Sequence, residues 1–550
     1  MATRKGPPEL LSPVVLIVLT GVLLVVVFVV YRSSLDYQFI LDDHHYVGDP
    51  RLQSSGHIWE YFTSFVWAQV AGGPPSFYRP LFLLWMRVNF ILCGLSPGGW
   101  HLLSIAKHLA AVTCLGLLVW KLLRDRTAAL LAMTLFALHP SHTESVAWIS
   151  VPDPLMAAAI LGSLILYFNY ADAQSDPGKP RRKGRKVDHA RPWPWLAASA
   201  AGCFVALLAK ETGIILPALI FALTFALPIG RDPGTTPLKS RMLGAIRVSL
   251  PFVAVTAIYL LLRRHALGEI SPHTQDLPFR TVLLSWPATL WFYGKALLWP
   301  VRSRAFADSI PADTFSMSGV FIPALAVICI GVFLASFCLW AWRRAQLDLS
   351  ERDAVGVQRA LVVGALLLVL PILLTLNLNA LVPGDFLHGR YVYLPAAGLM
   401  LLLATAWRLI NKNRLWLLIA AGLVAVAFAG LTLQQEGAWK DDLAVFTMAH
   451  EIAPRNQPVR LSLARAQVQL AMHLDEEGRC EEAIPILEGA TREYPQDWFA
   501  WAGLGECFFK LNDMPRAEQS LHQASDLSNL PRVTEQWQQL RARMGLSPAP

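Results

Sequence analysis

Two adjacent carboxylates, Asp42 and Asp43, follow the first apolar segment of the chain. At a membrane face a carboxylate can act as a general base toward a hydroxyl group, or it can hold a divalent metal together with His44 or His45. A solvated loop would also carry such acids, and the pair alone does not separate these interpretations. Because charges are costly near a lipid bilayer, the pair is still a candidate functional site.

A second polar cluster is the hexapeptide HPSHTE at residues 139–144. Its spacing, H-x2-H-x-E, could ligate a metal or bind sugar hydroxyls. Pro140 interrupts a helix here and leaves backbone groups in need of partners. We also expect a helix cap, in which Ser141 or Thr143 begins the next helix with Glu144 in its first turn. The candidate ligands are His139, His142 and Glu144.

Ionisable residues also interrupt the apolar segments. His101 and His108 are seven residues apart and therefore share one face of a long helix, while Lys210 and Glu211 separate two short apolar segments. Groups of this kind inside a membrane are functional candidates by default. The alternatives are histidines bonded to backbone carbonyls, and a lysine and glutamate that form a mutual ion pair.

Two arginines, Arg79 and Arg390, stand beside aromatic residues near predicted membrane surfaces. The planar guanidinium suits a phosphate because it donates two parallel hydrogen bonds, although an arginine that snorkels to the interface is the alternative. Taken together, acids, histidines and cations around an apolar bundle suit a lipid-linked phosphate substrate. Its tail would lie in the bilayer, its phosphate would meet a cation, and its sugar would meet the carboxylates.

The composition is that of a membrane protein with many crossings. Of the 550 residues, 54% are hydrophobic and 16% are charged, and the mean hydropathy is +0.43. The net charge of +8 belongs to the loops of the membrane part, so no nucleic acid is expected as a partner. Long apolar segments lie near residues 12–31, 100–121, 143–170, 247–263, 319–342, 357–376, 391–410 and 414–434. Three shorter ones at 127–140, 193–209 and 212–228 bring the expected total to about 11 spans.

Positive charge orients this bundle. Counting spans alternately puts the N-terminus and five basic loops on the cytoplasmic side: 121–126, 181–186, 231–247, 343–352 and 412–414. Asp42 and Asp43, the HPSHTE segment, the loop before Arg390 and the C-terminal tail then face the opposite side. The count requires residues 283–300 to be re-entrant or interfacial. We interpret residues 81–95 as a helix that lies on the membrane surface.

The tail repeats with a period of 34 residues. Five positions of one unit recur in the next: Leu470, Ala471, Ala483, Leu487 and Ala490 correspond to Leu504, Gly505, Ala517, Leu521 and Ala524. Small residues let two helices approach and large ones fill the gaps, which is the tetratricopeptide pattern. We therefore predict two domains, 1–434 and 435–550, the second ending in a capping helix at 532–544. Cys480 and Cys507 either meet in this domain or remain two separate buried thiols.

The motifs together resemble the transmembrane O-mannosyltransferases that carry tetratricopeptide repeats, and their bacterial relatives, among the GT-C membrane glycosyltransferases. The resemblance extends over about residues 35–400. It is carried by Asp42-Asp43, Tyr78-Arg79-Pro80-Leu81, Trp100-His101 with His108, His139-Pro140 with His142-Thr143-Glu144, Lys210-Glu211, and Arg390-Tyr391 with Tyr393-Leu394-Pro395. Val151-Pro152 stands where the family usually has Gly-Arg, which leaves the identity of the sugar open.

The resemblance implies an all-α, GT-C-like bundle and a polyprenyl- or dolichyl-phosphate sugar as the donor. It implies transfer of mannose or another hexose to a hydroxyl of a protein or glycan, with Asp42 or Asp43 as the base. No cofactor is certain, and a divalent metal stays open. The predicted catalytic residues are therefore Asp42 and Asp43. The predicted substrate-binding residues are Arg79, His101, His108, His139, His142, Glu144, Lys210, Glu211, Arg390, Tyr391 and Tyr393.

The expected location is the bacterial inner membrane, or the endoplasmic reticulum membrane of a eukaryote, with the repeats in the periplasm or lumen. Membrane lipids surround the bundle, and the repeats offer a surface for a protein partner. Two other functions stay open. One is a noncatalytic scaffold in which the bundle anchors the repeats. The other is a polymerase or ligase of lipid-linked polysaccharide, which would depend on the arginines and histidines and not on the acid pair.

Overall fold

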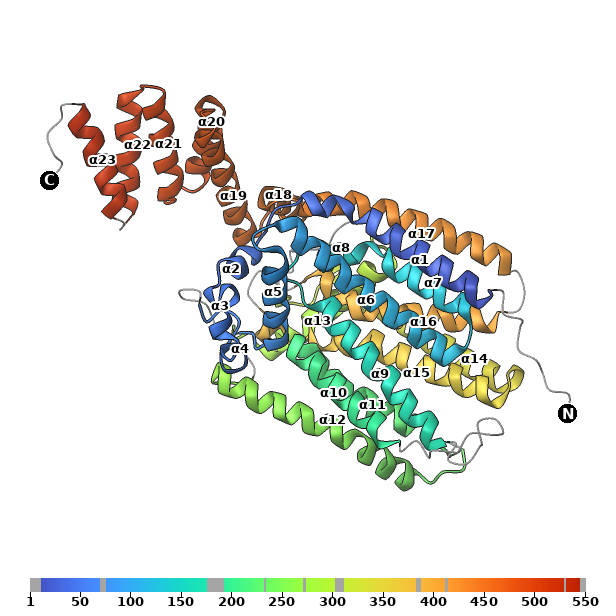
Figure 1. Cartoon of the computed structure of the whole chain (residues 1–550). Helices are drawn as coiled ribbons and strands as arrows, with labels where there is room; N and C mark the ends of the chain where they lie inside the picture. The colour runs from blue at the N-terminus through green and yellow to red at the C-terminus, as the bar shows by residue number, and fades with distance from the viewer. Residues whose placement is uncertain are drawn as a thin grey trace. The chain divides into compact units, whose positions relative to one another are not determined.

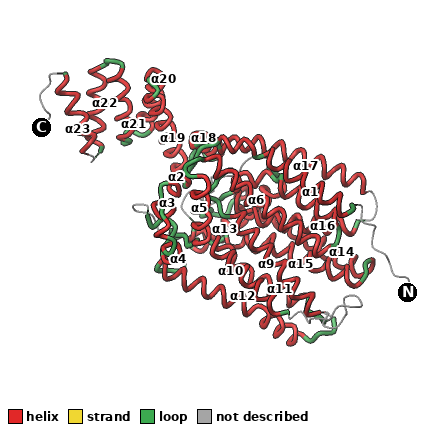
Figure 2. The backbone as a smooth tube through the Cα atoms, viewed as in Figure 1, coloured by secondary structure: helices red, strands yellow, loops and turns green. Residues whose placement is uncertain are grey.

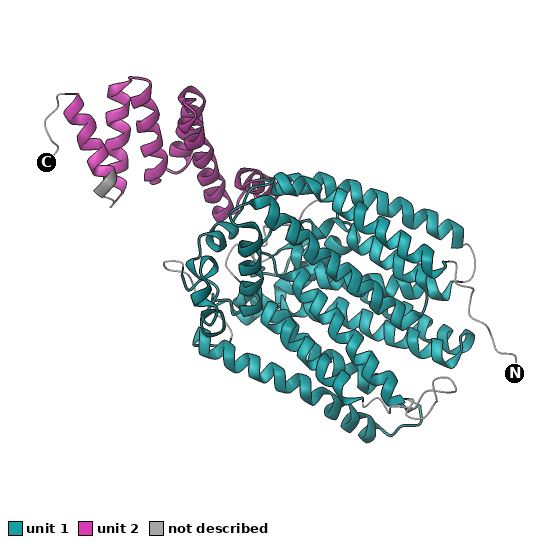
Figure 3. Cartoon of the chain, viewed as in Figure 1, with its two compact units in different colours: residues 1–305, 309–440 teal, residues 306–308, 441–550 magenta. Residues whose placement is uncertain are grey.

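The computed structural model describes residues 11–69, 76–175, 192–231, 234–270, 274–301, 311–381, 387–410, 414–528 and 531–544. These residues form helices and loops without a strand (Figure 2), so the predicted all-α class is confirmed. The chain divides into two compact units, residues 1–305 with 309–440 and residues 306–308 with 441–550 (Figure 3).

Within the described residues, the first unit has eight helical segments that are long and apolar enough to cross a membrane. Many of them run alongside one another (Figure 1), and each corresponds to one long span predicted from the sequence. The chain is therefore a multi-pass membrane protein. The helices are α1 (Pro13–Val30), α6 (Pro97–Leu123), α9 (Asp153–Ser175), α12 (Leu238–Leu267), α14 (Ile322–Asp348), α15 (Glu351–Leu374), α16 (Tyr393–Leu409) and α17 (Arg414–Glu436).

Shorter helices fill the spaces between these segments. The three short predicted spans are also helices, namely α7 (Arg126–Ala137), α10 (Trp193–Ala209) and α11 (Ile215–Ala226), and the expected surface helix is α5 (Pro80–Cys93). Residues Phe279–Leu298 form α13, a single helix of 20 residues. A continuous helix does not turn back on itself, so the re-entrant interpretation of residues 283–300 is wrong. The interfacial interpretation remains a prediction.

The predicted span at 143–170 is broken in the structure. A short helix, α8 (Thr143–Ala147), ends just before Trp148, and α9 begins only at Asp153. Residues 148–152 between them, here called the connector, are not helical. The break has a physical reason: proline disfavours the helical conformation in the residue before it, and Pro152 follows Val151 directly.

The centre of the membrane unit is α16. In the most apolar window of this span 83% of the residues are buried, compared with 11% for α14 and α17. It lies so close to α15 that a Cβ on Gly398 would be 2.5 Å from the backbone nitrogen of Leu368. Only glycine permits this approach. The neighbouring α6 packs on α7 and α9, and α9 packs on α10.

The loop with the two aspartates is held by three short helices, α2 (Asp43–Val47), α3 (Pro50–Gln53) and α4 (Glu60–Thr63). Asp49 caps α3 and forms a buried 2.6 Å ion pair with Arg51, whose guanidinium also donates to the carbonyls of Phe65 and Val66. Apolar side chains from this loop, including Leu52, pack into a buried cluster with α5 and α6. The loop is thus a packed layer that fixes the position of α2.

The second unit is a series of helices: α18 (Asp442–Ile452), α19 (Gln457–Glu476), α20 (Cys480–Glu493), α21 (Trp498–Lys510), α22 (Met514–Leu527) and α23 (Pro531–Arg543). Consecutive helices pack against each other. A Cβ on Gly505 would lie 2.6 Å from Cγ of Leu521, so the small residue is needed where α21 meets α22. Ala471, Ala483 and Ala517 are fully buried for the same reason.

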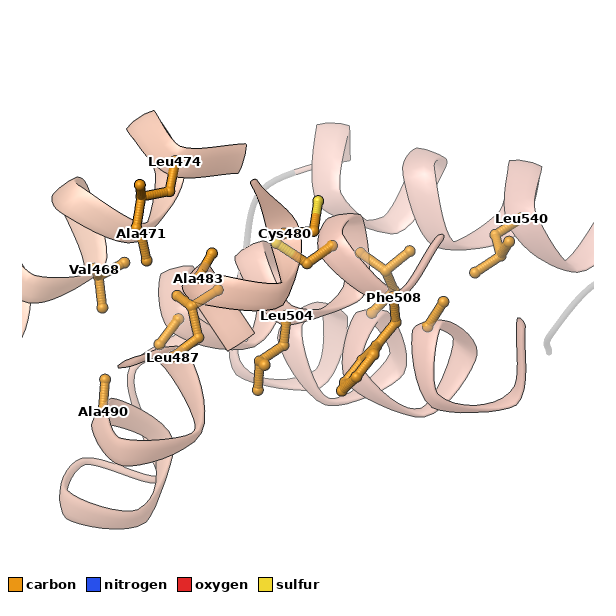
Figure 4. Close-up of a cluster of buried hydrophobic side chains, with 14 of the residues drawn as sticks. Val468, Ala471, Leu474, Cys480, Ala483, Leu487, Ala490, Leu504, Phe508 and Leu540 are labelled. Carbon is orange, nitrogen blue, oxygen red and sulfur yellow. The ribbon is translucent and has the colours of Figure 1, made fainter. Parts of the chain in front are cut away.

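Large apolar residues fill the remaining space in the second unit, as Figure 4 shows for Leu487, Leu504 and Phe508. The repeat period does not give equal burial at every position, since Leu470 is 37% exposed while its counterpart Leu504 is 2% exposed. Cys480 and Cys507 are both buried free thiols.

Candidate functional site

Asp43 is buried at the start of α2 and uses both carboxylate oxygens. Oδ1 accepts hydrogen bonds from the backbone NH, at 3.0 Å, and from the hydroxyl of Ser150, and Oδ2 accepts from the NH of Ile40 at 3.3 Å. Burial raises the pKa of Asp43 to about 7; the bonds from Ser150 and Ile40 oppose the rise, and the charge of Asp42 adds to it. Asp42, the preceding residue, is half-buried.

The connector is also held from its other side. The ammonium of Lys107, on α6, donates to the carbonyls of Ile149 at 3.1 Å and Val151 at 3.2 Å. Ser150 lies between these two residues and bonds to Asp43. A carboxylate and an ammonium from different elements therefore satisfy the backbone groups that the helix break leaves without helical partners.

Asp153 follows the connector and forms a buried ion pair with Lys210. The ammonium is 2.7 Å from each carboxylate oxygen, and it lies 5.0 Å from the centre of the Tyr391 ring. Both charged side chains are about 5% exposed or less. The alternative in which Lys210 and Glu211 form a mutual ion pair is therefore not the observed arrangement, because Lys210 binds an aspartate on α9.

Glu211 instead forms an ion pair with Arg79, which lies 132 residues earlier in the sequence. The guanidinium donates two hydrogen bonds, from Nε at 3.0 Å and from Nη2 at 2.6 Å, in the parallel geometry typical of arginine and carboxylate. Arg79 also lies over the ring of Phe77, 4.1 Å from its centre. The pair joins the start of α5 to η4 (Glu211–Ile214).

Glu144, on α8, is bound by the loop before α16. Its carboxylate accepts from the ring of His388 at 3.0 Å and from the NH of Arg390 at 2.9 Å, and the Arg390 guanidinium lies 3.4 Å away. Burial would raise the pKa of Glu144, but His388 and Arg390 outweigh it and hold this pKa below its ordinary value. A Cβ on Gly389 would lie 3.1 Å from the carboxylate, so the glycine leaves room for it.

Arg390 also meets the connector directly, because its guanidinium lies 4.7 Å from the centre of the Trp148 ring. Asp43 binds Ser150, two residues further along the chain. Two residues span about 7 Å at most, so the early aspartate and the late arginine contact neighbouring parts of one short segment.

The predicted histidines lie in the interior and bond mainly to backbone carbonyls. His108 bonds to the carbonyl of Ala137 at 3.0 Å and to the hydroxyl of Tyr393 at 2.7 Å, and His101 lies 3.5 Å from the carbonyl of Gln38. His139 lies 3.1 Å from the carbonyl of Leu297. This is the arrangement considered above as the alternative to a ligand role.

His139 and His142 do not gather around Glu144 as a ligand set. In the described chain, the one group of at least three acid, histidine or cysteine ligands close enough to hold an ion lies in the second unit. His142 packs against the rings of Phe136 and Tyr393 instead. Burial lowers the pKa of His139 to about 4, so its ring is neutral near pH 7.

The cap predicted for this segment takes a different form. The residue before α8 is His142, which provides no side-chain cap, while the ring of His139 accepts from the NH of Ser141. The hydroxyl of Thr143 bonds back to the carbonyl of Pro140. The helix does begin at Thr143, one of the two predicted starting residues, but neither hydroxyl caps it, because both are used within the turn. Glu144 does lie in the first turn of α8, as expected.

Sequence reasoning missed several residues of this site. Ser150, Asp153 and His388 each bind a predicted site residue, and Trp148 lies beneath Arg390. One sequence signal was available, since Asp153 is an acid directly after a Val-Pro pair within an apolar stretch. The others have partners so distant in sequence that no local pattern reveals them.

Comparison with known proteins agrees with the predicted resemblance. A family model described as "Tetratricopeptide repeat" matches residues 476–544. The chain is similar to mouse protein O-mannosyl-transferase TMTC3, with 24% identity covering 91% of the chain and 54% of the relative. It is also similar to protein O-mannosyl-transferase Tmtc1 of Drosophila melanogaster, with 25% identity covering 83% of the chain and 59% of the relative. The chain thus spans little more than half the length of these relatives.

Two solved structures show a weaker likeness. One is the Archaeoglobus fulgidus oligosaccharyltransferase in the apo form, with a TM-score of 0.42 and 12% identity, covering 82% of this chain and 59% of that one. The other is ArnT from Cupriavidus metallidurans bound to undecaprenyl phosphate, with a TM-score of 0.39 and 16% identity, covering 92% and 79%. Both TM-scores are below 0.5, so neither assigns the fold.

Proposed function

We propose that this protein is a membrane glycosyltransferase that moves a hexose from a polyprenyl-phosphate donor to a hydroxyl of a protein or glycan acceptor. The main support is the connector, where the environments of Asp43 and Arg390 meet within two residues. Asp42 directly precedes Asp43, so this connector has an acid for the acceptor side and a cation for the phosphate side of a displacement at a sugar carbon. The names of the similar O-mannosyltransferases support the same class of reaction.

In the proposed mechanism Asp42 is the general base. It is half-buried, whereas Asp43 is only 2% exposed, so an acceptor hydroxyl can approach Asp42 more easily. Asp42 removes the proton of the acceptor hydroxyl as its oxygen bonds to the anomeric carbon. The bond from that carbon to the phosphate oxygen breaks in the same step, and the electron pair leaves with the lipid phosphate. A single displacement of this kind inverts the anomeric configuration.

Arg390 is the proposed ligand of the departing phosphate. Arg79 and Lys210 make close ion pairs, with shortest distances of 2.6 Å to Glu211 and 2.7 Å to Asp153. The Arg390 guanidinium is 3.4 Å from Glu144 and 4.7 Å from the centre of the Trp148 ring, so it lies directly beside the connector that Asp43 also binds. Arg79 and Lys210 then act by fixing the elements around the site.

Asp43 is proposed as a positioning residue. It holds the connector through Ser150, and the connector in turn presents Trp148 to Arg390. The site is proposed to face away from the cytoplasm, with the N-terminus inside and the repeats in the periplasm or lumen. This orientation follows from the basic loops.

The test uses the purified full chain with labelled polyprenyl-phosphate hexoses and a hydroxyl acceptor, with and without a chelator. We expect a glycosylated product from the wild type and a loss of at least about 100-fold in Asp42→Asn, the range for removal of a general base. Asp36→Asn is the matched control, since Asp36 is an exposed aspartate six residues earlier. A scaffold without catalysis would give no product with any donor, which would refute the proposal.

A further inference from the structure

The second unit contains a compact cluster of potential metal ligands that plays no part in the proposed transfer. Asp475 lies at the end of α19, Cys480 begins α20, and Cys507 lies on α21. One oxygen of Asp475 accepts from both thiols, at 2.9 Å from Cys480 and 3.4 Å from Cys507. Three helices therefore direct a carboxylate and two sulfurs at one point.

The separation of these groups suits a small ion. One ligand atom from each residue, two sulfurs and one oxygen, lies within 4.8 Å of the other two. In a tetrahedral zinc site, bonds of about 2.3 Å to sulfur and about 2.1 Å to oxygen place neighbouring ligands roughly 3.5–3.8 Å apart. The two sulfurs, 2.9 and 3.4 Å from the Asp475 oxygen, would move away from it by less than about 1 Å, and the sulfurs, at most 4.8 Å apart, would approach each other by about 1 Å at most.

We propose that Asp475, Cys480 and Cys507 bind one Zn²⁺ that ties α19, α20 and α21 together. Two thiolates and a monodentate carboxylate are ligands that zinc accepts, and a water completes the tetrahedron. The thiols give up their two protons to the solvent as their sulfurs bind the metal, so one Zn²⁺ replaces two H⁺. No bond between the sulfurs forms, and nothing is oxidised.

Lys510 supports this assignment. Its ammonium donates to the other oxygen of Asp475 at 2.7 Å and to the Asp475 carbonyl at 3.1 Å. Carboxylates that bind metals are themselves held by hydrogen bonds of this kind, which fix the orientation of the ligand. The charges also balance: two thiolates and one carboxylate offset one Zn²⁺ and one ammonium.

The position of the cluster allows the metal to enter. Cys480 and Cys507 are 2% and 0% exposed, but Asp475 is 7% exposed and the Lys510 side chain is 39% exposed. The site thus has an apolar inner side, formed by the repeat core, and an edge near solvent. Zinc bound there would stabilise the junction between the two repeats in the native state only.

The direct test is zinc binding by the full chain in detergent, with any histidine tag removed and the thiols kept reduced. Competition with a chromophoric chelator should give one Zn²⁺ per chain, with about two protons released per ion. Cys480→Ser and Cys507→Ser should each abolish this binding, and Asp475→Asn should weaken it by at least about tenfold. Cys329→Ser, which alters an exposed cysteine of the membrane unit, is the matched control and should bind as the wild type does.

Thiol alkylation followed by peptide mass spectrometry gives a readout that needs no variant. Because both thiols are buried in the folded chain, alkylation is followed in mild denaturant, where Zn²⁺ should slow the reaction of Cys480 and Cys507 relative to the zinc-free chain and leave the rate at Cys329 unchanged. The proposal is overturned if the reduced wild type binds no zinc, or if the Cys480→Ser protein binds as much as the wild type. A disulfide between Cys480 and Cys507 in protein isolated without reductant would also overturn it, since the bond consumes both sulfur ligands.

Discussion

The pH dependence of transfer should follow the ionisation of Asp43. As a carboxylate, Asp43 accepts hydrogen bonds from Ser150 and from the NH of Ile40. Protonation puts a hydrogen on one of the two carboxylate oxygens, which can then no longer accept the hydrogen bond it makes in the ionised form. The connector therefore loses part of its support. Transfer should therefore require the ionised form and fall as the pH decreases through the pKa of this group.

The size of the effect follows from the pKa of Asp43, which burial raises to about 7. About 9% of the molecules would be ionised at pH 6 and about 91% at pH 8, so kcat/KM should rise about tenfold between these values. Stability should change in the opposite direction. Folding raises this pKa, so Asp43 lowers the free energy of unfolding least below about pH 4, where the group is protonated in both the folded and the unfolded state. The free energy of unfolding should then fall by roughly 4 kcal/mol as the pH rises to about 7.

The assay measures kcat/KM with one labelled donor from pH 5 to pH 9, in parallel with thermal unfolding of the same samples. Asp43→Asn is the comparison, because its amide does not titrate. We expect the variant to have lower activity, no rise of kcat/KM with a midpoint near pH 7, and a weaker decline of stability between pH 4 and pH 7. If kcat/KM of Asp43→Asn rises with pH as it does in the wild type, another group is responsible and the role given to Asp43 is wrong.

Three further outcomes test the packing and the orientation. Lys210→Met should destabilise the folded protein by about 3–5 kcal/mol because it leaves the Asp153 carboxylate buried without its partner. Thermal unfolding should show that adding Asp153→Asn restores part of the lost stability, and no such recovery would contradict the pairing. Gly398→Ala should cost about 1–3 kcal/mol or more, since the added Cβ would meet the backbone of Leu368; a melting temperature equal to that of the wild type would refute this close approach. A reporter enzyme active only outside the cytoplasm should work when fused to the C-terminus and fail at the N-terminus, and the reverse pattern would contradict the orientation.

The sequence predicted those features that depend on a local pattern of residue types. Long apolar runs located the eight candidate membrane spans of the described residues, because a span needs about 20 such residues whatever it packs against. The period of 34 located the repeats, since the same small and large residues recur wherever helix pairs stack. The acid pair stood out because charge is costly beside a membrane.

The partners within the site could not be predicted in this way. Lys210 and Glu211 are adjacent in sequence, yet each pairs with a residue from a distant element, 57 positions away for Asp153 and 132 for Arg79. The connector was hidden because residues 143–170 are largely apolar, and hydropathy does not register a helix break at Pro152. Such contacts depend on how helices pack, which a single sequence does not specify.

The most direct test of the proposed function compares glycosyl transfer by Asp42→Asn with transfer by the wild type. Both proteins would be purified as full chains and incubated with labelled polyprenyl-phosphate hexose and a hydroxyl acceptor, and the anomeric configuration of the product would be determined. We predict an inverted product from the wild type and a loss of at least about 100-fold in the variant, with unchanged thermal unfolding. Equal transfer by the two proteins would contradict the role of Asp42, and a retained configuration would contradict the single displacement.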